Sequence, residues 1–461
     1  MVIRKLNKRT MILLILIILI AIPFGIYFKN QIQFNSKQKP FKEKFLSDTS
    51  NKLPQFEDTS LPFEHQFEDD GNSMPFLDIK LIHPYNDERI AVMQTGGDKQ
   101  QNVVFLNENG IFKDITKVTN LGGFENEAAY SIAIGDIDND GVDEILVGYA
   151  TGIYMSKYNG TNYNDPVKLF DVPEASIPHD IALSDTNKNG FLDVFVCTFV
   201  DRKHFASATY HDLTNKRQNI YMVNNGDGTF TERAKGAGLY LVENSYLAKF
   251  VDLNNNGFED LVLASNTNVG KIYENLGDGT FKEHNLPMDY GFWMGLSVEK
   301  LHENADKYHI LMSNIGQSFP VAIVRGDLKK EEVFDPHYAF LEQVDGFKFK
   351  NVTHQKNLDS NKFGWGVVFA DLNNNGRKDA VVTENYIKYP ARIHKNFPSK
   401  GKVFFQNNDE TFAPFQEEIG LLNPHFGYRV IAHDFTGNGY QDVIIGNVNG
   451  PIKLFKNKGV K

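Results

Sequence analysis

Cysteine is almost absent from this chain, which has a single one among 461 residues. An internal disulfide is therefore excluded, and other contacts have to hold the loops in place. The one thiol, Cys197, lies in the apolar stretch DVFVCTFV, which predicts a buried and unreactive side chain. Tryptophan is also scarce, and we expect the only two, Trp293 and Trp365, to serve in packing.

An excess of positive charge is missing as well. The formal net charge is −10, which argues against a surface that binds nucleic acid. Much of the negative charge comes from aspartates that cluster in loops. Glycine and phenylalanine, with 37 residues each, are by contrast plentiful, as expected for many short strands joined by tight turns.

One long uncharged run lies near the N-terminus. Residues 11–28 (MILLILIILIAIPFGIYF) carry no charge and follow four basic residues, Arg4, Lys5, Lys8 and Arg9. About 20 apolar residues span a bilayer, and flanking basic residues favour the cytoplasmic side. A cleavable signal peptide would have a shorter apolar core and a small-residue cleavage site. The sequence predicts a cytoplasmic tail over 1–10, a single transmembrane signal anchor over 11–28, and an extracytoplasmic remainder, periplasmic or at the cell surface.

The rest of the chain repeats itself after a polar stretch over residues 29–70. One recurring unit is a short apolar run, a loop that opens with aspartate and a second apolar strand, with the loops starting at Asp136, Asp185, Asp252, Asp371 and Asp434. The other is a turn between aromatic-flanked strands, as in NNGDGTF (224–230) and NLGDGTF (275–281). Asparagine and glycine there supply the positive φ of tight hairpins. A long gap between the third and fourth loops predicts a degenerate unit, and another precedes the first loop. The seven units are 76–127, 128–178, 179–243, 244–290, 291–360, 361–425 and 426–461.

Seven units of several short strands predict an all-β fold, a seven-bladed β-propeller of four-stranded blades over residues 71–461, preceded by the N-terminal transmembrane helix. A calcium-binding β-helix has a period of about nine residues and does not fit. The last unit stops before an outermost strand forms. We therefore expect residues 29–70 to be a stalk that also contains a closing strand, near 55–70, for the last blade.

The loops share the pattern D-x-[DNT]-x-[DN]-G-x-x-[DE]. Positions 1, 3 and 5 bring side-chain oxygens together, glycine at position 6 allows a sharp turn, position 7 offers a carbonyl and position 9 a carboxylate. Calcium takes six to eight oxygen ligands, and this pattern supplies most of them. An EF-hand is excluded because position 12 is apolar, as at Val147, and a strand follows. The alternative is that these runs are simple turns.

We predict up to five calcium sites. The first loop carries four carboxylates, so residues 136–144 are expected to bind calcium most tightly, while the loop at 434, with Thr436, is the weakest candidate. The candidate ligands, at positions 1, 3, 5, 7 and 9, are Asp136, Asp138, Asp140, Val142, Glu144, Asp185, Asn187, Asn189, Phe191, Asp193, Asp252, Asn254, Asn256, Phe258, Asp260, Asp371, Asn373, Asn375, Arg377, Asp379, Asp434, Thr436, Asn438, Tyr440 and Asp442.

These loops and their surroundings resemble the FG-GAP or VCBS repeat family, which includes the propellers of integrin α-subunits. The segments 224–239 (NNGDGTFTERAKGAGL), 364–385 and 428–457 are most similar to the branch of the cartilage acidic protein propellers. The resemblance covers about residues 100–457 and implies a seven-bladed propeller with calcium in its blade loops. Units one and five lack the loop, so it implies no site there. The C-terminal domain of many members of that branch has no counterpart in this sequence.

Two classes of function remain open. The first is a binding, adhesion or scaffold module that presents a propeller face to a protein or glycan. The second is a propeller enzyme acting on carbohydrate, of the lyase or dehydratase type. Loops on a rigid scaffold carry function, so the insertions 198–220 and 385–402 are the expected partner loops. Polar residues that an enzyme would need are His179, His204, Tyr210, His211, Tyr386, Tyr389, Arg392 and His394.

Overall fold

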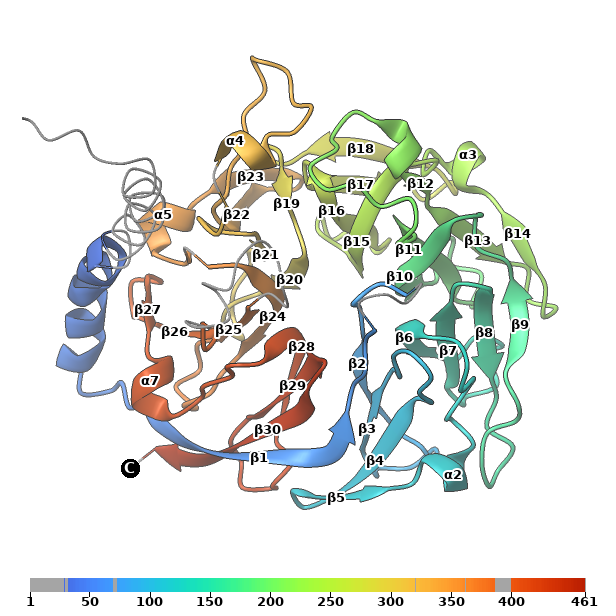
Figure 1. Cartoon of the computed structure of the whole chain (residues 1–461), viewed down its shortest axis with the longest axis horizontal. Helices are drawn as coiled ribbons and strands as arrows, with labels where there is room; N and C mark the ends of the chain where they lie inside the picture. The colour runs from blue at the N-terminus through green and yellow to red at the C-terminus, as the bar shows by residue number, and fades with distance from the viewer. Residues whose placement is uncertain are drawn as a thin grey trace, which may run out of the picture.

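Seven antiparallel sheets surround a central axis in the computed structural model, which describes residue 29 and residues 32–68, 73–319, 321–360, 362–385 and 399–460. The sheets follow one another around a ring (Figure 1). The predicted all-β, seven-bladed propeller of four-stranded blades is confirmed. Blade 4 is larger, because two short strands are added to its four.

Each blade runs outward from the axis in chain order. Blade 1 consists of β2 (Ile79–Ile82), β3 (Ala91–Gln94), β4 (Val103–Glu108) and β5 (Ile111–Asp114). Blade 2 consists of β6 (Ala129–Gly135), β7 (Glu144–Tyr149), β8 (Gly152–Ser156) and β9 (Val167–Phe170). Blade 3 consists of β10 (Ser176–Ser184), β11 (Asp193–Val200), β13 (Ile220–Asn224) and β14 (Phe230–Glu232). Blade 4 consists of β15 (Val242–Val251), β16 (Asp260–Asn268), β17 (Lys271–Asn275) and β18 (Phe281–Asn285), joined by β12 (Arg217–Gln218) and β19 (Gly291–Phe292).

Blades 5 and 6 repeat this order, and blade 7 takes its outermost strand from the start of the described chain. Blade 5 consists of β20 (Gly295–Glu299), β21 (His309–Ser313), β22 (Ala339–Asp345) and β23 (Lys348–Asn351). Blade 6 consists of β24 (Gly364–Ala370), β25 (Asp379–Glu384), β26 (Lys402–Gln406) and β27 (Phe412–Pro414). Blade 7 consists of β28 (Phe426–His433), β29 (Asp442–Val448), β30 (Pro451–Val460) and, outermost, β1 (Pro54–Glu64). Short helices lie in the connections: α2 (Thr116–Thr119), η1 (Leu213–Asn215), α3 (Ala234–Ala237), α4 (Val321–Val324), α5 (Thr353–Lys356) and α7 (Gln416–Ile419).

The two ends of the chain close the ring together. β1 pairs antiparallel with β30, from Pro54 opposite Val460 to Glu64 opposite Pro451. Figure 1 shows this blue strand along the edge of the red blade 7. The expected closing strand is confirmed. It supplies the fourth, outermost strand of blade 7, so the two ends of the chain are joined within one sheet.

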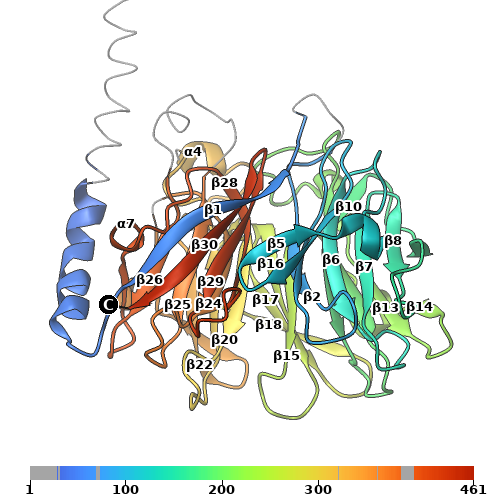
Figure 2. The same ribbon diagram turned by 90° about the horizontal axis from the view of Figure 1, so that it is seen from below.

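Part of the expected stalk belongs to the folded body. Residues 32–47 are helical and run beside the ring in both views (Figures 1 and 2). Phe45 is fully buried and packs against Phe405 and Phe415 of blade 6, with ring centroids 5.6 and 5.0 Å apart. Lys42 pairs with Glu418 at 2.6 Å. The sequence predicted an irregular polar stalk here, but Phe41 and Phe45 lie on one face of the helix and pack against the core cluster of blades 6 and 7.

The helices within the described ranges include none that is long and apolar enough to cross a membrane. The predicted transmembrane segment, residues 11–28, lies outside those ranges. The other predictions for single residues are met: Cys197 and Trp293 are fully buried, and Trp365 nearly so. The indole N–H of Trp293 donates to the carbonyl of Asn268 at 3.0 Å.

Aromatic rings fill the axis of the propeller. In five blades the pairing of the first two strands skips one or two residues, and this bulge contains Tyr130, His179, Tyr246, Trp365 or Tyr428. A bulge redirects a side chain, and here these rings gather around Phe76, which lies 4.7 Å from the His179 ring and 5.5 Å from the Tyr428 ring. We call this group of rings the axial plug. It joins the inner strands of separate blades in one hydrophobic core.

Candidate metal-binding loops and the opposite face

Five loops with the aspartate pattern join the first and second strands of blades 2, 3, 4, 6 and 7. We call them the Asp loops: 136–144, 185–193, 252–260, 371–379 and 434–442. All five share one backbone conformation. Position 6 is glycine with φ between 81° and 92°, and position 4 is also left-handed, with φ between 55° and 70°. The sequence pattern revealed the first of these positions but not the second, which is filled by Asn139, Lys188, Asn255, Asn374 and Gly437.

The carboxylate at position 1 organises each Asp loop. Its two oxygens accept the backbone N–H groups of positions 5 and 6 at 2.7–3.1 Å in all five loops. The side-chain oxygen at position 5 accepts the N–H of position 7 at 2.8–2.9 Å. These contacts bring the predicted ligand residues of each loop together around one turn.

The carboxylate at position 9 has a structural role that the sequence did not reveal. It is buried in every Asp loop. In the loop of blade 3, Asp193 accepts the N–H of Thr186 at 3.2 Å and the N–H of Asn224 at 2.8 Å. The equivalent Asp260 accepts from Leu253 and Asn275, both at 2.9 Å. In these two loops, position 9 therefore ties the loop to the end of the third strand of its own blade.

The loop at 371 has the same contacts, whereas the loop at 434 differs at one of them. Asp379 accepts from Leu372 and Gln406, both at 3.0 Å. In the last loop, Asp442 accepts from position 3, the N–H of Thr436, at 2.9 Å. In this loop, which was predicted to be the weakest site, the N–H of position 3 is therefore bound to the position 9 carboxylate. In the other four loops it is the N–H of position 2.

Neighbouring blades are joined through position 2 of the same loops. Its N–H is held by position 9 in four of them, and its carbonyl accepts a side-chain amide from the next blade. We call this contact the interblade latch. The five latches, with distances of 2.7–2.9 Å, run from Asn224 to Ile137, Asn275 to Thr186, Gln343 to Leu253, Asn457 to Leu372 and Asn107 to Phe435. Several of these asparagines are the first residue of the recurrent Asn-Gly turns. The repeat pattern therefore marked their positions, although not their partners.

Burial raises the pKa of the position 9 carboxyl groups. The pKa of Glu144 rises to about 7 and that of Asp260 to about 6, chiefly because desolvation penalises the charged form. Burial also raises the pKa of Asp193 and Asp379. A cation beside these carboxylates would stabilise their charged forms.

The first Asp loop has the donor set that suits calcium best. Carboxylate oxygens of Asp136, Asp138 and Glu144 lie within 4.8 Å of one another. Within the described part of the chain, Oδ1 of Asp138 is buried and has no hydrogen-bond partner, while its other oxygen contacts the Lys157 ammonium group. A buried acceptor without a partner is costly, and a bound cation would satisfy it.

The loop of blade 6 shows the same feature at the same position. Asn373 donates its side-chain N–H to the carbonyl of Lys52 at 3.0 Å, which fixes the orientation of the amide. Its Oδ1 is buried and lacks a hydrogen-bond partner among the described residues. The position 3 oxygens of Asn187 and Asn254 instead accept the position 5 amides at 3.0 Å. All-oxygen donor sets of this kind fit calcium.

Blade 5 uses an ion pair where blades 2, 3, 4, 6 and 7 have an Asp loop. Glu299, at the end of β20, contacts Lys249 of blade 4 at 3.1 Å and Lys378 of blade 6 at 2.8 Å. Its pKa is lowered, since the two ammonium groups outweigh the effect of burial. The degenerate unit thus links its neighbours through two lysines.

The opposite end of the ring is built by two long insertions. One joins β11 to β13 (201–219) and the other joins β21 to β22 (314–338). Tyr210 of the first donates its N–H to Asp327 of the second at 2.5 Å and its hydroxyl to the carbonyl of Val324 at 2.8 Å. His211 contacts Glu332 at 2.6 Å. The insertions of blades 3 and 5 therefore meet in front of blade 4, and we call their shared surface the insertion face.

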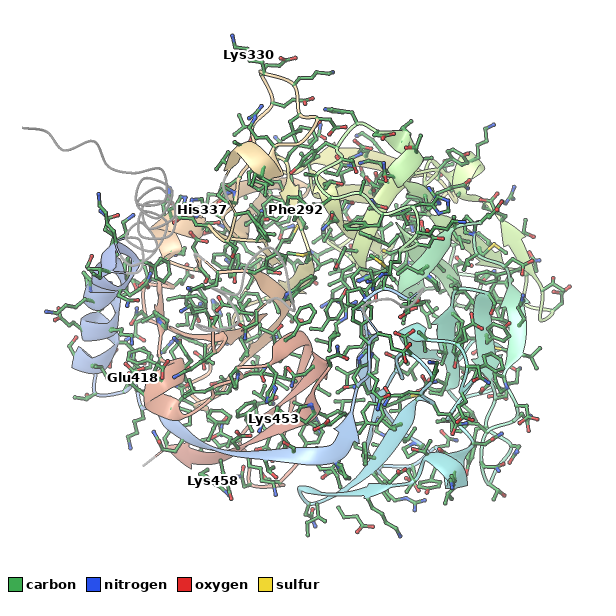
Figure 3. All side chains as sticks on the ribbon, in the orientation of Figure 1. Phe292, Lys330, His337, Glu418, Lys453 and Lys458 are labelled. Carbon is green, nitrogen blue, oxygen red and sulfur yellow. The ribbon has the colours of Figure 1, made fainter. Side chains whose placement is uncertain are left out.

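Apolar side chains are exposed on the insertion face. The exposed fractions are 42% for Phe205, 62% for Leu213, 50% for Val321, 63% for Ile323 and 53% for Val333. The tip of the second insertion, at Lys330, projects beyond the ring (Figure 3). The sequence pointed to the first of these insertions and missed the second. The other insertion expected from the sequence, 385–402, contains Tyr386, Tyr389, Arg392 and His394, and these four residues lie outside the described ranges.

Of the histidines singled out for an enzyme, the three within the described ranges, His179, His204 and His211, each have separate partners. His179 is fully buried in the axial plug, with Nδ1 2.5 Å from the carbonyl of Tyr246 and Nε2 2.5 Å from the hydroxyl of Tyr428. His204 pairs with Asp201 at 2.7 Å, and His211 is bound to the other insertion. Both ring nitrogens of His179 are thus engaged in hydrogen bonds inside the core.

One repeat family and several solved structures are similar to this chain. No curated protein matches the chain. Among solved structures, an Agrocybe aegerita lectin that recognises non-reducing terminal N-acetylglucosamine is 19% identical, with a TM-score of 0.44 over 83% of this chain and 90% of that chain. BBS1N in complex with ARL6DN is 9% identical, with a TM-score of 0.47 over 89% and 99% of the two chains. The extracellular domain of the one-component system BT4673 from B. thetaiotaomicron is 11% identical, with a TM-score of 0.43 over 87% of this chain and 39% of that chain. Residues 86–147, which include the first Asp loop, match the FG-GAP-like repeat family, so the chain is a seven-bladed β-propeller that contains an FG-GAP-like repeat.

Proposed function

We propose that this protein is a membrane-anchored, extracytoplasmic propeller, held together by calcium in its Asp loops, that binds a protein partner on its insertion face. The seven-bladed fold with an FG-GAP-like repeat suggests a binding or scaffold module. The predicted kinship with the cartilage acidic protein branch agrees with this proposal. Each finer element of it rests on a separate observation.

The exposed apolar side chains on the insertion face carry the proposal of a partner. Long loops on a rigid scaffold are the usual place for binding, and the two insertions are fixed to each other by the Tyr210 and His211 contacts. Aliphatic groups such as Leu213 and Ile323 are more than half exposed. Several exposed apolar groups on loops that are fixed to each other suit a surface for a partner. Their aliphatic character favours a protein over a glycan.

Calcium is supported by the common geometry of the Asp loops and by the unpartnered oxygens of Asp138 and Asn373. Adhesion is one use of such a module. Membrane attachment is supported by the apolar run over 11–28. The helical residues 32–47 that follow are docked on blade 6 through Phe45, which would hold the ring at a fixed position relative to the anchor.

Photo-crosslinking in cells tests the insertion face. A photoreactive amino acid placed at Ile323 is expected to yield a discrete crosslinked protein species. Val118, on α2 of blade 1, is the matched control, since its side chain is 60% exposed against 63% for Ile323. Equal crosslinking at both positions, or none at Ile323, would contradict a partner on this face.

Cysteine labelling tests the topology. The only native thiol, Cys197, is fully buried, and burial raises its pKa well above the usual range. Labelling by a maleimide is therefore expected only at an introduced cysteine. Lys330→Cys is expected to react with a membrane-impermeant maleimide in intact cells. Lys5→Cys, on the predicted cytoplasmic tail, is expected to react only after lysis. The reverse pattern would refute the proposed orientation.

A further inference from the structure

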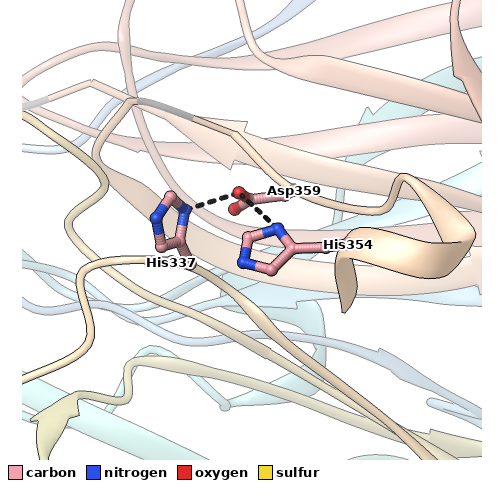
Figure 4. Close-up of side chains that lie close together, drawn as sticks. All are labelled: His337, His354 and Asp359. Carbon is pink, nitrogen blue, oxygen red and sulfur yellow. Dashed lines mark hydrogen bonds and ion pairs between the residues drawn. The ribbon is translucent and has the colours of Figure 1, made fainter. Parts of the chain in front are cut away.

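A second cluster of metal-ligating side chains lies on blade 5, at the end of the ring opposite the Asp loops. His337 ends the β21–β22 connection, His354 lies in α5, and Asp359 follows α5. Oδ2 of Asp359 is 2.6 Å from Nδ1 of His337 and 3.9 Å from Nδ1 of His354 (Figure 4). One candidate ligand atom from each residue lies within 4.8 Å of the other two.

The backbone prepares this cluster. The second oxygen of Asp359, Oδ1, accepts the N–H groups of Tyr338 at 3.1 Å and Ser360 at 2.7 Å, which leaves Oδ2 directed at the histidines. Hydrogen bonds that orient a ligand in this way are typical of metal sites. Asn357 ends α5 in a left-handed conformation and is anchored to the carbonyl of Phe412 at 2.7 Å. The turn between His354 and Asp359 is therefore fixed at both ends.

Two imidazoles and one carboxylate form a donor set for a first-row transition ion such as Zn²⁺, in contrast to the all-oxygen Asp loops. Zinc bonds of about 2.0–2.2 Å place tetrahedral ligands about 3.4 Å apart. The observed separations of 2.6 and 3.9 Å lie on either side of that value, so small side-chain rotations suffice. We propose that His337, His354 and Asp359 bind Zn²⁺ and leave a fourth position open to water or to a ligand group.

A simple ion pair between His337 and Asp359 explains only part of this geometry. Their hydrogen bond raises the pKa of His337, and zinc would have to replace this hydrogen bond. His354 is not needed for such a pair, and 71% of its side chain is exposed. Its ring nevertheless lies edge-on to the His337 ring, with centroids 4.8 Å apart. Zinc binding accounts for the presence of all three residues.

Calorimetric titration of the full-length chain in detergent tests the proposal. The protein is stripped with chelator, dialysed, and kept in excess Ca²⁺ so that the Asp loops do not compete. Zn²⁺ is expected to bind at one site per chain, and Co²⁺ as a probe is expected to give the visible bands of a tetrahedral ion. His354→Ala and Asp359→Asn are each expected to weaken zinc binding by at least about tenfold.

His302→Ala is the matched control, since this exposed histidine lies at the other end of the same blade, between β20 and β21. It is expected to bind zinc like the parent chain. Melting curves without metal check that His354→Ala folds, as the exposure of this side chain leads one to expect. The proposal is overturned if the parent chain binds no zinc, or if the His354 and His302 variants bind it equally well.

Discussion

Removing calcium with a chelator is expected to lower the melting temperature of the protein by about 10 °C. A ligand that binds only the folded state contributes about 2.7 kcal/mol per site when its concentration is 100 times its dissociation constant. Two or three filled Asp loops would then supply about 5–8 kcal/mol. One kcal/mol shifts the melting temperature by about 2–4 °C in domains of 150–250 residues, and by less in larger ones. Calorimetric melting curves with calcium and with chelator measure the shift.

A pair of variants in the first Asp loop tests whether this shift of the melting temperature comes from calcium bound there. Asp138→Asn removes a carboxylate whose buried oxygen has no hydrogen-bond partner among the described residues, and it should reduce the calcium-dependent part of the melting temperature. Asp143→Asn makes the same change of charge at an exposed position of the same loop that is not a candidate ligand, and should leave that part unchanged. If chelator does not shift the melting temperature of the parent chain, the Asp loops are turns without a calcium function.

The sequence predicted the repeating architecture because each blade is encoded locally. The strand pairs, the Asp loops and the Asn-Gly turns all lie within one unit, so their spacing revealed seven blades. The closing strand was predicted because the last unit contains residues for only three strands of a four-stranded blade. The docked helix over 32–47 was missed because its stability comes from Phe45 inserting against Phe405 and Phe415, far away in the chain.

The contacts between blades could not be predicted in the same way. The latch from Asn224 to Ile137 spans 87 positions, and that from Asn107 to Phe435 spans 328. Periodicity shows that these residues recur but not which blade receives each amide. The zinc cluster was missed for a related reason, because His337 is brought to His354 and Asp359 only when β22 and β23 form their hairpin.

Replacing Asp193 with asparagine is expected to destabilise the protein by about 2 kcal/mol whether calcium is present or not. Both oxygens of this buried carboxylate accept backbone N–H groups, from Thr186 on one side and Asn224 on the other. An asparagine amide can accept on only one side, so one buried donor would face another donor, at a cost of about 1–3 kcal/mol. The neutral side chain avoids part of the desolvation that raises the pKa of Asp193, which limits the loss. Urea unfolding measures it, with Asp227→Asn in an exposed turn as the control.

The effect of chelator separates the two roles of position 9. If Asp193 served only as a calcium ligand, the loss in the Asp193→Asn variant would vanish once calcium is removed. If it ties the loop to its blade, the loss persists. Asn275→Ala probes the next contact, because Asn275 donates to the carbonyl of the same Thr186 at 2.8 Å. Residues that share a partner show coupling energies of about 0.5–3 kcal/mol in a double-mutant cycle. A coupling near zero would mean that the two hydrogen bonds at Thr186 act independently. The Asp loops would then be separate turns, and they would not couple the stability of one blade to that of the next.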